Sequence, residues 1–152
     1  NAMAKNLEQA ANKFLDLTSR LRRLGPGAPL PEEAQISPSL LSLVEYAAAA
    51  PGCGIQEMAK GLNLATPTVS ISVRQLEDAG FVERQPDPQD GRAVRLFLTP
   101  KGQKLYQRMH EFRCQKFERL LTGLTPHERA TLLTLLEKAV SAAEIKEQGD
   151  KK

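Results

Sequence analysis

The stretch TPTVSISVRQLEDAGFVERQPDPQDGRAVRLFLTPKG, residues 66–102, decides the fold of this chain. Its first part predicts a helix over 67–79, because apolar residues recur there at helical spacing. Gly80 follows at the position where a residue with positive φ commonly ends a helix. Two short apolar runs, 81–84 and 93–98, flank a loop rich in turn-forming residues, and this pattern predicts a β-hairpin.

Helix beginnings are marked by a repeated pair, a hydroxyl residue directly followed by proline. The hydroxyl can accept a hydrogen bond from a free backbone N–H of the first turn, and proline at the first helical position loses no hydrogen bond. The pair occurs at residues 37–38, 66–67, 99–100 and 125–126. The pattern therefore predicts helices over 38–50, 67–79, 100–121 and 126–147, with a frayed tail over 148–152.

Two further helices are expected, over 4–23 and 56–61. The first has apolar residues at helical spacing and ends at a stretch dense in Gly and Pro, residues 25–31. Residues 53–55 are a candidate for a very short strand. Between the helices over 56–61 and 67–79 lies a turn with Asn63, a residue type that tolerates unusual backbone angles. Two short helices joined by such a turn predict a helix-turn-helix.

The second helix of this pair has two different faces. Val69, Val73 and Leu76 fall within a narrow arc and are expected to pack inward, where Ala59 allows a close approach. The opposite arc and its flanks carry the candidate DNA-contacting residues Thr66, Pro67, Thr68, Ser70, Ile71, Arg74 and Gln75. Small hydroxyl side chains let a helix enter a major groove and bond phosphates or base edges. Exposed Ser and Thr are also common in proteins, so a merely solubilising role is the alternative.

The hairpin favours DNA binding over a merely solvated surface. Its tip carries Arg92, with Arg84 and Arg95 nearby, and an arginine on a projecting loop suits a minor groove or phosphates. Asp87 and Asp90 in the same loop are expected to shape it and to orient Arg92. We therefore add Arg84, Asp90, Arg92 and Arg95 to the candidate DNA-binding residues.

These residues resemble the MarR family of transcription regulators. The resemblance rests on residues 66–70, 76–84, 87–92 and 98–102, whose order and spacing together are specific. It implies a homodimer of winged-helix domains joined by intertwined N- and C-terminal helices. It also implies a recognition helix over 66–78 and a wing-tip Asp-x-Arg at Asp90 and Arg92. Two positions depart from the pattern: Ile71 replaces a frequent polar residue, which suggests contact with a thymine methyl, and Gly91 replaces a frequent second arginine.

The first and last predicted helices carry more apolar residues than a core of about 60 residues can cover. The last one has Leu132, Leu133, Leu135, Leu136, Ala139, Val140 and Ala143. Exposed apolar stripes of this size are rare in monomers, so we expect a second copy to cover them. Packing of these helices within one chain is the alternative.

Composition excludes several classes of protein. The 152 residues are 41% hydrophobic and 26% charged, with 21 Lys and Arg against 18 Asp and Glu, which gives a net charge of +3. No apolar run is long enough to cross a membrane. No Gly-rich phosphate loop, zinc-protease motif or nucleophile elbow is present, so we expect no enzyme and no cofactor. Only two cysteines and no signal peptide predict a cytoplasmic protein.

The cysteines and histidines suggest two further kinds of site, a metal centre and a redox-active thiol. His110 and Cys114 lie four residues apart on one predicted helix, but further metal ligands are not evident, since His127 lies on another helix. We therefore predict no metal site. A thiol-based redox sensor of the same fold, acting through Cys53 or Cys114, remains an alternative, although partly buried inert thiols are the more ordinary interpretation.

The sequence thus predicts a mainly α fold with a small β-hairpin: a winged helix-turn-helix core over 37–99, flanked by N-terminal (4–36) and C-terminal (100–152) dimerisation segments. Its predicted function is that of a MarR-type regulator, a repressor that binds palindromic operator double-stranded DNA as a homodimer. By the resemblance, a small amphipathic or aromatic ligand releases the DNA, with Phe14, Leu17 and Tyr46 as candidate pocket residues. A winged-helix dimer that binds protein is a further alternative, disfavoured by the cationic face of Arg74, Arg92 and Arg95.

Overall fold

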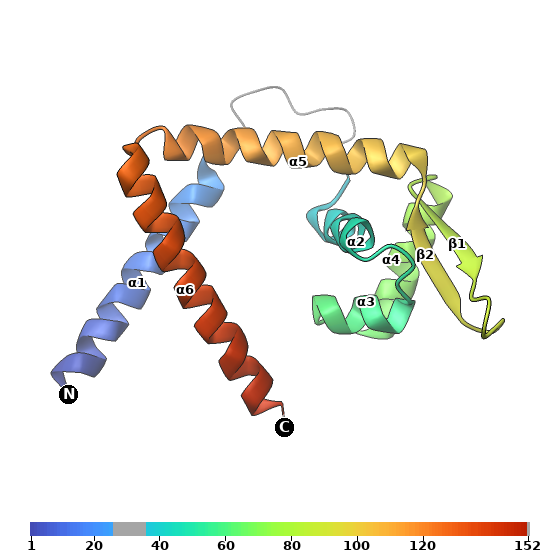
Figure 1. The fold of residues 1–152 in the computed structure, drawn as a ribbon, viewed down its shortest axis with the longest axis horizontal. Helices are drawn as coiled ribbons and strands as arrows, with labels where there is room; N and C mark the ends of the chain where they lie inside the picture. The colour runs from blue at the N-terminus through green and yellow to red at the C-terminus, as the bar shows by residue number, and fades with distance from the viewer. Residues whose placement is uncertain (26–35, 152) are drawn as a thin grey trace. The chain divides into compact units, whose positions relative to one another are not determined.

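The computed structural model describes residues 1–25 and 36–151, and this part of the chain forms six helices and one hairpin (Figure 1). In chain order the elements are α1 (Ala2–Arg23), α2 (Pro38–Ala49), α3 (Ile55–Leu62), α4 (Thr66–Asp78), β1 (Val82–Pro86), β2 (Val94–Leu98), α5 (Pro100–Leu121) and α6 (Pro126–Asp150). The predicted mainly α fold with a small hairpin is confirmed. Most of the predicted Gly- and Pro-rich break at 25–31 lies outside the described residues.

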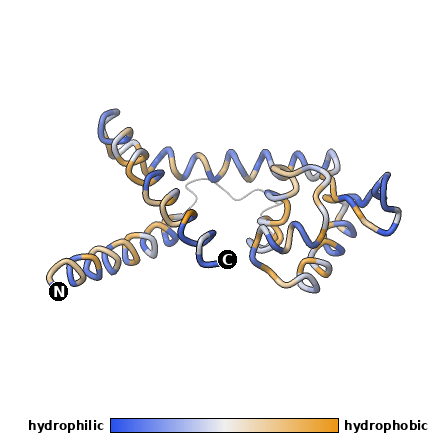
Figure 2. Tube along the Cα trace, turned by 60° about the horizontal axis from the view of Figure 1, so that its bottom comes forward, coloured by the Kyte–Doolittle hydropathy of each residue, from blue (hydrophilic) through white to orange (hydrophobic). Residues whose placement is uncertain are grey.

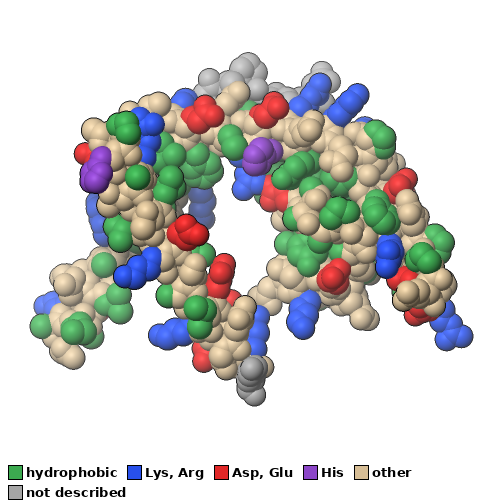
Figure 3. Space-filling view, viewed as in Figure 1, with side chains coloured by type: hydrophobic (Ala, Val, Ile, Leu, Met, Phe, Trp, Pro, Cys, Tyr) green, Lys and Arg blue, Asp and Glu red, His purple; other side chains and the backbone are tan. Residues whose placement is uncertain are grey.

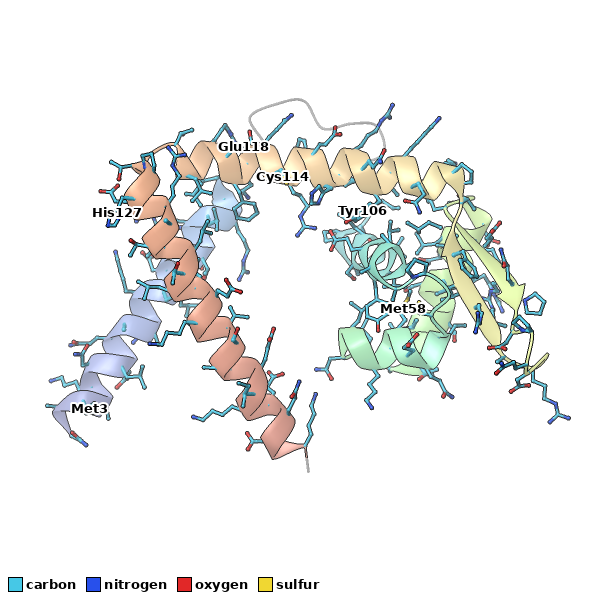
Figure 4. All side chains as sticks on the ribbon, viewed as in Figure 1. Met3, Met58, Tyr106, Cys114, Glu118 and His127 are labelled. Atoms are coloured by element: carbon cyan, nitrogen blue, oxygen red, sulfur yellow. The ribbon has the colours of Figure 1, made fainter. Side chains whose placement is uncertain are left out.

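The core lies where α2, α3 and α4 meet the hairpin and the first turns of α5. Its largest fully buried side chains are Leu43, Val44, Met58, Val69, Val73, Leu76, Leu96 and Leu105. Figure 4 shows Met58 among these elements, with Tyr106 on the side of α5 that faces α2. The predicted inward arc of α4 is therefore correct, and its burial determines which side of the helix faces solvent.

Three of the four predicted hydroxyl caps are present. The hydroxyl of Ser37 accepts the N–H of Leu40 at 3.3 Å, and Thr99 and Thr125 cap α5 and α6 in the same way. The prediction for Thr66 is wrong. The Val69 N–H donates to the Ala65 carbonyl at 3.1 Å, so Ala65 is the cap and Thr66 is already the first residue of α4.

The turn between α3 and α4 is tight. Asn63 has φ of 55° and ψ of 45°, in the left-handed region that asparagine tolerates, and the Leu64 N–H donates to the Ala59 carbonyl at 2.8 Å. Ala59 is buried, as expected for the residue beside which α4 passes. The predicted helix-turn-helix is thus formed by α3 and α4.

The hairpin pairs β1 with β2 in antiparallel register, from Val82 opposite Leu98 to Pro86 opposite Val94. It lies beside α4 in Figure 1, and β1 packs against that helix. Cys53 forms an isolated antiparallel bridge with Leu96, which agrees with the very short strand expected there. This bridge places the beginning of α3 beside β2.

The two ends of the chain are helical and uncovered. Neither α1 nor α6 contains a buried residue, and Leu7 and Leu135 are 71% and 59% exposed. Apolar positions recur along α1 in Figure 2, and Figure 3 shows hydrophobic side chains on the surface near its N-terminus. Packing of these stripes into the chain's own core is therefore not observed in the described residues.

The predicted end of α6 is wrong by three residues, since the helix continues to Asp150 through residues that include no proline. The described chain forms two compact units, residues 1–112 and 113–152. None of its described helices is long and apolar enough to cross a membrane.

Candidate nucleic-acid interface

The outward arc of α4 is a continuous exposed surface. Of the predicted contact residues on this helix, Ser70 is half-buried and the others, Thr66, Pro67, Thr68, Ile71, Arg74 and Gln75, are exposed. Ile71 is 63% exposed, so its apolar side chain is available for contact on this face of the helix. The buried arc on the other side holds the helix so that these residues face solvent together.

The recognition helix begins with groups suited to phosphate. Because Ala65 caps α4 without a side-chain hydrogen bond, its first backbone N–H groups are not satisfied by a capping side chain. The positive end of the helix dipole lies at the same place, and Thr66 and Thr68 add hydroxyl donors beside it. This end of α4 can therefore bind an anionic oxygen.

The wing loop between β1 and β2 is shaped by two aspartates, as predicted. Asp87 Oδ1 accepts the N–H groups of Gln89 and Asp90 at 2.8 and 3.3 Å. Asp90 Oδ1 accepts the N–H of Arg92 at 3.0 Å, and the Ala93 N–H donates to the Asp90 carbonyl at 2.9 Å. These bonds determine the backbone from which the Arg92 side chain projects.

The charge of Asp87 is stabilised by the loop. The N–H of Gln89 is the largest influence that holds the pKa of the Asp87 carboxyl below its ordinary value. The N–H of Asp90 and the Arg95 guanidinium act in the same direction, since each favours the ionised form. Asp87 is therefore a carboxylate whose role is internal to the wing.

The four candidate arginines fall into two groups. Arg84 Nε lies 3.2 Å from Glu77 Oε2 of α4, an ion pair without a well-aligned hydrogen bond, and Arg95 Nε donates to Asp87 Oδ2 at 3.2 Å. In the described part of the chain Arg74 and Arg92 have no such ion pair, and both are exposed. The second group is the one with charge free to meet a polyanion, and Figure 3 shows basic side chains at the hairpin's end.

A shallow groove of about 420 Å³ runs between the beginning of α3 and the wing. Its lining residues are Gly54, Ile55, Gln56, Asp90, Arg92, Ala93 and Val94. The prediction of a contact surface on α4 and the wing did not include Ile55 or Gln56. Their proximity to Arg92 depends on the bridge between Cys53 and Leu96, for which the expected short strand was the only sequence signal.

The candidate effector residues lie in different surroundings. Phe14 and Leu17 are exposed on α1. Tyr46 is half-buried on α2, packs against the core, and its hydroxyl donates to the Glu57 carbonyl at 3.4 Å. The ring of Tyr46 also occupies the space beside Gly61, where any Cβ would overlap it. Tyr46 therefore has a packing role between α2 and α3.

The cysteines and histidines form no evident metal centre. In residues 1–25 and 36–151 no group of three or more potential His, Cys, Asp or Glu ligands comes together. His110 stacks on Tyr106 with ring centroids 5.9 Å apart, and Figure 4 places Cys114 on α5 and His127 on α6. Cys53 is buried, and burial raises the pKa of its thiol, with a smaller contribution in the same direction from the Glu57 carboxylate.

One set of contacts at the other end of α4 was missed by sequence reasoning. Lys101 Nζ donates to the Ala79 carbonyl at 2.8 Å, and Thr99 Oγ1 donates to the Gly80 carbonyl at 2.5 Å. The Thr99-Pro100-Lys101-Gly102 run was interpreted as a helix start and as part of the family resemblance, but no role was assigned to Lys101. Its lysine, two residues into a helix that follows a hairpin, was the available signal.

Comparison with known proteins identifies close similarity in sequence and fold. Residues 36–94 match the model of the MarR family. The HTH-type transcriptional regulator BilQ of Clostridium symbiosum is 34% identical over 103 residues, which are 68% of this chain and 72% of BilQ.

Solved structures extend the likeness to the fold. The apo form of wild-type MarR from Escherichia coli is 28% identical with a TM-score of 0.64, over 70% of this chain and 79% of MarR. FabT of Streptococcus pneumoniae, whose structure was solved in complex with DNA, has a TM-score of 0.67 at 24% identity, over 93% of this chain and 95% of FabT. The fold of this chain is therefore the winged-helix fold of these proteins.

Proposed function

Because this chain belongs to the MarR family of transcriptional regulators, we propose that it represses transcription by binding palindromic operator DNA as a homodimer. In this proposal a small ligand binds the homodimer and releases it from the DNA. As a transcriptional regulator it is not an enzyme, in agreement with the sequence-based expectation. A protein that reads chromosomal DNA works where the DNA is, and we propose a cytoplasmic location. In this proposal residues 37–99 form the DNA-binding domain, and residues 4–36 and 100–152 form the dimerisation segments.

One observation carries the DNA-binding proposal. The outward arc of α4 exposes hydroxyl, amide, apolar and guanidinium groups on one face, while Val69, Val73 and Leu76 on the other face are buried. Such a face provides hydrogen bonds to base edges and an apolar contact for thymine, the two kinds of direct readout that a major groove offers. Arg92 on the wing adds a cation beyond the end of that helix.

Each candidate residue has a proposed role. Arg74 contacts a guanine edge or a phosphate, and Ile71 packs on a thymine methyl. Thr66, Pro67, Thr68 and Ser70 let the N-terminal end of α4 approach the backbone closely, and Gln75 reaches a neighbouring base or phosphate. Arg92, presented by Asp90, reaches the flanking minor groove, whereas Arg84 and Arg95 brace the hairpin and add positive potential near phosphates.

Two uncovered helices support the homodimer. The apolar residues of α1 and α6 are exposed in the described chain, and water exposure of so many large side chains is costly. A two-fold pairing would cover them and would place two recognition helices in successive major grooves, about 10 base pairs apart. An inverted-repeat operator follows from this symmetry.

Release by an effector follows from differential affinity. A ligand that binds the DNA-incompetent dimer more tightly than the competent one shifts the population away from DNA. We propose an amphipathic, aromatic ligand and a pocket that includes Phe14, Leu17 and Tyr46, because α1 exposes the side chains of Phe14 and Leu17 and Tyr46 is an amphipathic residue that is only half-buried.

The alternatives are less well supported by the side chains. Redox sensing through Cys53 requires a thiolate, and burial raises the pKa of that thiol. Cys114 is exposed between Arg113 and Lys116, and it is the cysteine on which a redox response would depend. A purely protein-binding winged helix does not require the unpaired charges of Arg74 and Arg92.

The test of the proposed function is selection of bound duplexes from a random-sequence pool, followed by fluorescence anisotropy with the enriched duplex. We expect an inverted repeat and an affinity that falls steeply between about 50 and 200 mM salt, because Lys and Arg release counterions from phosphates. No enrichment, or an affinity indifferent to salt, would contradict the proposal. Addition of a panel of aromatic carboxylic acids to the complex then tests release.

A further inference from the structure

The C-terminal end of the recognition helix is held by the beginning of α5. The last carbonyl groups of a helix lack partners within it. Here Lys101 Nζ donates to the Ala79 carbonyl at 2.8 Å and Thr99 Oγ1 donates to the Gly80 carbonyl at 2.5 Å. The same Thr99 oxygen accepts the Gly102 N–H at 3.1 Å, so one hydroxyl joins the end of α4 to the first turn of α5.

The contact continues over Phe81. The Lys101 ammonium lies 4.7 Å from the centroid of the Phe81 ring, within the range of a cation–π interaction. The Phe81 carbonyl accepts the Thr99 N–H at 3.0 Å, and it lies so close to Gly102 that any Cβ there would overlap it. Residues 79–81 are therefore each in contact with the segment that begins α5.

We propose that Lys101 is a positioning residue for DNA recognition, which sets the direction of α4 by holding its C-terminal carbonyl and Phe81 without itself contacting DNA. The ammonium also lies at the negative end of the α4 dipole, where a cation is favourable. Lys101 is exposed, so the core does not require its charge. The inference rests on the proposed DNA-binding function, because direction matters only if α4 enters a groove.

The experiment compares Lys101→Met, Lys101→Arg and the matched control Lys104→Met. Methionine keeps an apolar stem over Phe81 but removes the ammonium, and arginine restores a cation and a donor. Lys104 is an exposed lysine of the same helix, so its substitution removes the same charge. Each variant is titrated with the selected operator and with random duplex DNA over a series of salt concentrations.

For Lys101→Met we expect operator affinity to fall about three- to tenfold, as for the net loss of one ordinary hydrogen bond at an exposed site. Affinity for random DNA and the salt slope should stay those of Lys104→Met, and Lys101→Arg should recover most of the operator affinity. A salt slope reduced by about one, with equal losses on both DNAs, would overturn the proposal by making Lys101 a phosphate contact. Unchanged operator affinity in Lys101→Met would also overturn it.

A readout without DNA separates this inference from the proposed function. Amide hydrogen exchange at Gly80 and Phe81 should be faster in Lys101→Met than in the parent and in Lys104→Met, while exchange in the Val69 and Val73 turns stays slow. If the parent binds no duplex, the proposed function fails, and equal exchange rates at residues 80–81 would then show that the lysine does not hold α4.

Discussion

Arg95 and Asp87 form an ion pair at the base of the wing: Arg95 Nε donates to Asp87 Oδ2 at 3.2 Å. Arg95 lies on β2, and Asp87 is the residue at which the loop leaves β1. Asp87 also gathers the N–H groups of Gln89 and Asp90, so one carboxylate connects the strand arginine to the loop backbone. Asp87 thus connects β2 to the first part of the loop, and Asp90, whose Oδ1 accepts the N–H of Arg92, orders the part that presents Arg92.

Replacing Asp87 with asparagine should loosen the wing. The amide oxygen can still accept the loop N–H groups, but the charge facing Arg95 is lost, so we expect operator affinity to fall about two- to fivefold. The unfolding midpoint at neutral pH should change little. Faster amide exchange at Gln89, Asp90 and Arg92 is the direct check, and exchange equal to that of the parent would show that the pair does not order the loop.

The same carboxyl predicts a pH dependence. The pKa of Asp87 in the folded chain is below its ordinary value of 3.8. The contribution of the Asp87 carboxylate to the stability of the folded state is therefore complete above pH 3.8 and is lost as the pH falls through the lower pKa of the folded state. Urea unfolding between about pH 5 and 2 should therefore show a steeper loss of stability in the parent than in Asp87→Asn. Parallel curves would contradict this role.

Alanine substitutions of Arg74 and Arg92 should weaken DNA binding in different ways. Arg74→Ala should weaken the free energy of operator binding by about 1–3 kcal/mol. If Arg74 contacts a base, the same substitution should also relax the preference for that base at one operator position. Arg92→Ala should weaken binding to operator and random DNA alike and lower the salt slope by about one. Competition titrations with both DNAs separate these outcomes, with circular dichroism as the control for folding. Parent-like binding by Arg92→Ala would exclude the wing from the interface.

Ile71 should read a thymine methyl. Replacing that thymine with uracil removes one methyl group, which should lower the parent's affinity by about 0.8 kcal/mol, the value of one buried carbon. In Ile71→Ala the same base change should have almost no effect, because the partner surface is already absent. A double-mutant cycle over each thymine of the operator measures this coupling. Coupling near zero at every thymine would assign the exposed isoleucine another role.

Replacing an exposed apolar residue of α1 or α6 with a charged residue should prevent dimerisation. Leu7→Asp on α1 and Leu135→Asp on α6 each place a carboxylate on an exposed apolar stripe, where pairing would bury it unpaired. We expect each variant to sediment as a monomer at concentrations where the parent and the control Glu137→Gln are dimers. Helical content should persist by circular dichroism. A fully dimeric Leu135→Asp would exclude that part of α6 from the interface.

The parts of the fold that follow local rules could be predicted from sequence. The inward arc Val69, Val73 and Leu76 follows from helical periodicity alone, and the hairpin follows from its turn residues. The prediction that Thr66 caps the helix was wrong, because a hydroxyl residue before proline marks a helix start only to within one residue. The hydrogen bond from the Val69 N–H to the Ala65 carbonyl makes Ala65 the cap and Thr66 the first helical residue.

Contacts between elements could not be predicted in the same way. The pairing of Arg84 with Glu77 depends on how β1 packs against α4, and the reach of Lys101 to Ala79 depends on how α5 leaves the hairpin. Neither distance is encoded in a local pattern. The candidate DNA-binding residues other than Ser70 and Arg84 proved exposed, but exposure alone does not assign them a base or a phosphate.

Hydroxyl-radical footprinting of the parent protein on its selected operator tests dimeric, two-fold DNA recognition most directly. We expect two protected segments related by the operator's dyad, about 10 base pairs apart from centre to centre, with lighter protection outside them where the wings lie. A single protected segment, or protection without two-fold symmetry, would contradict recognition of DNA by a pair of winged helices.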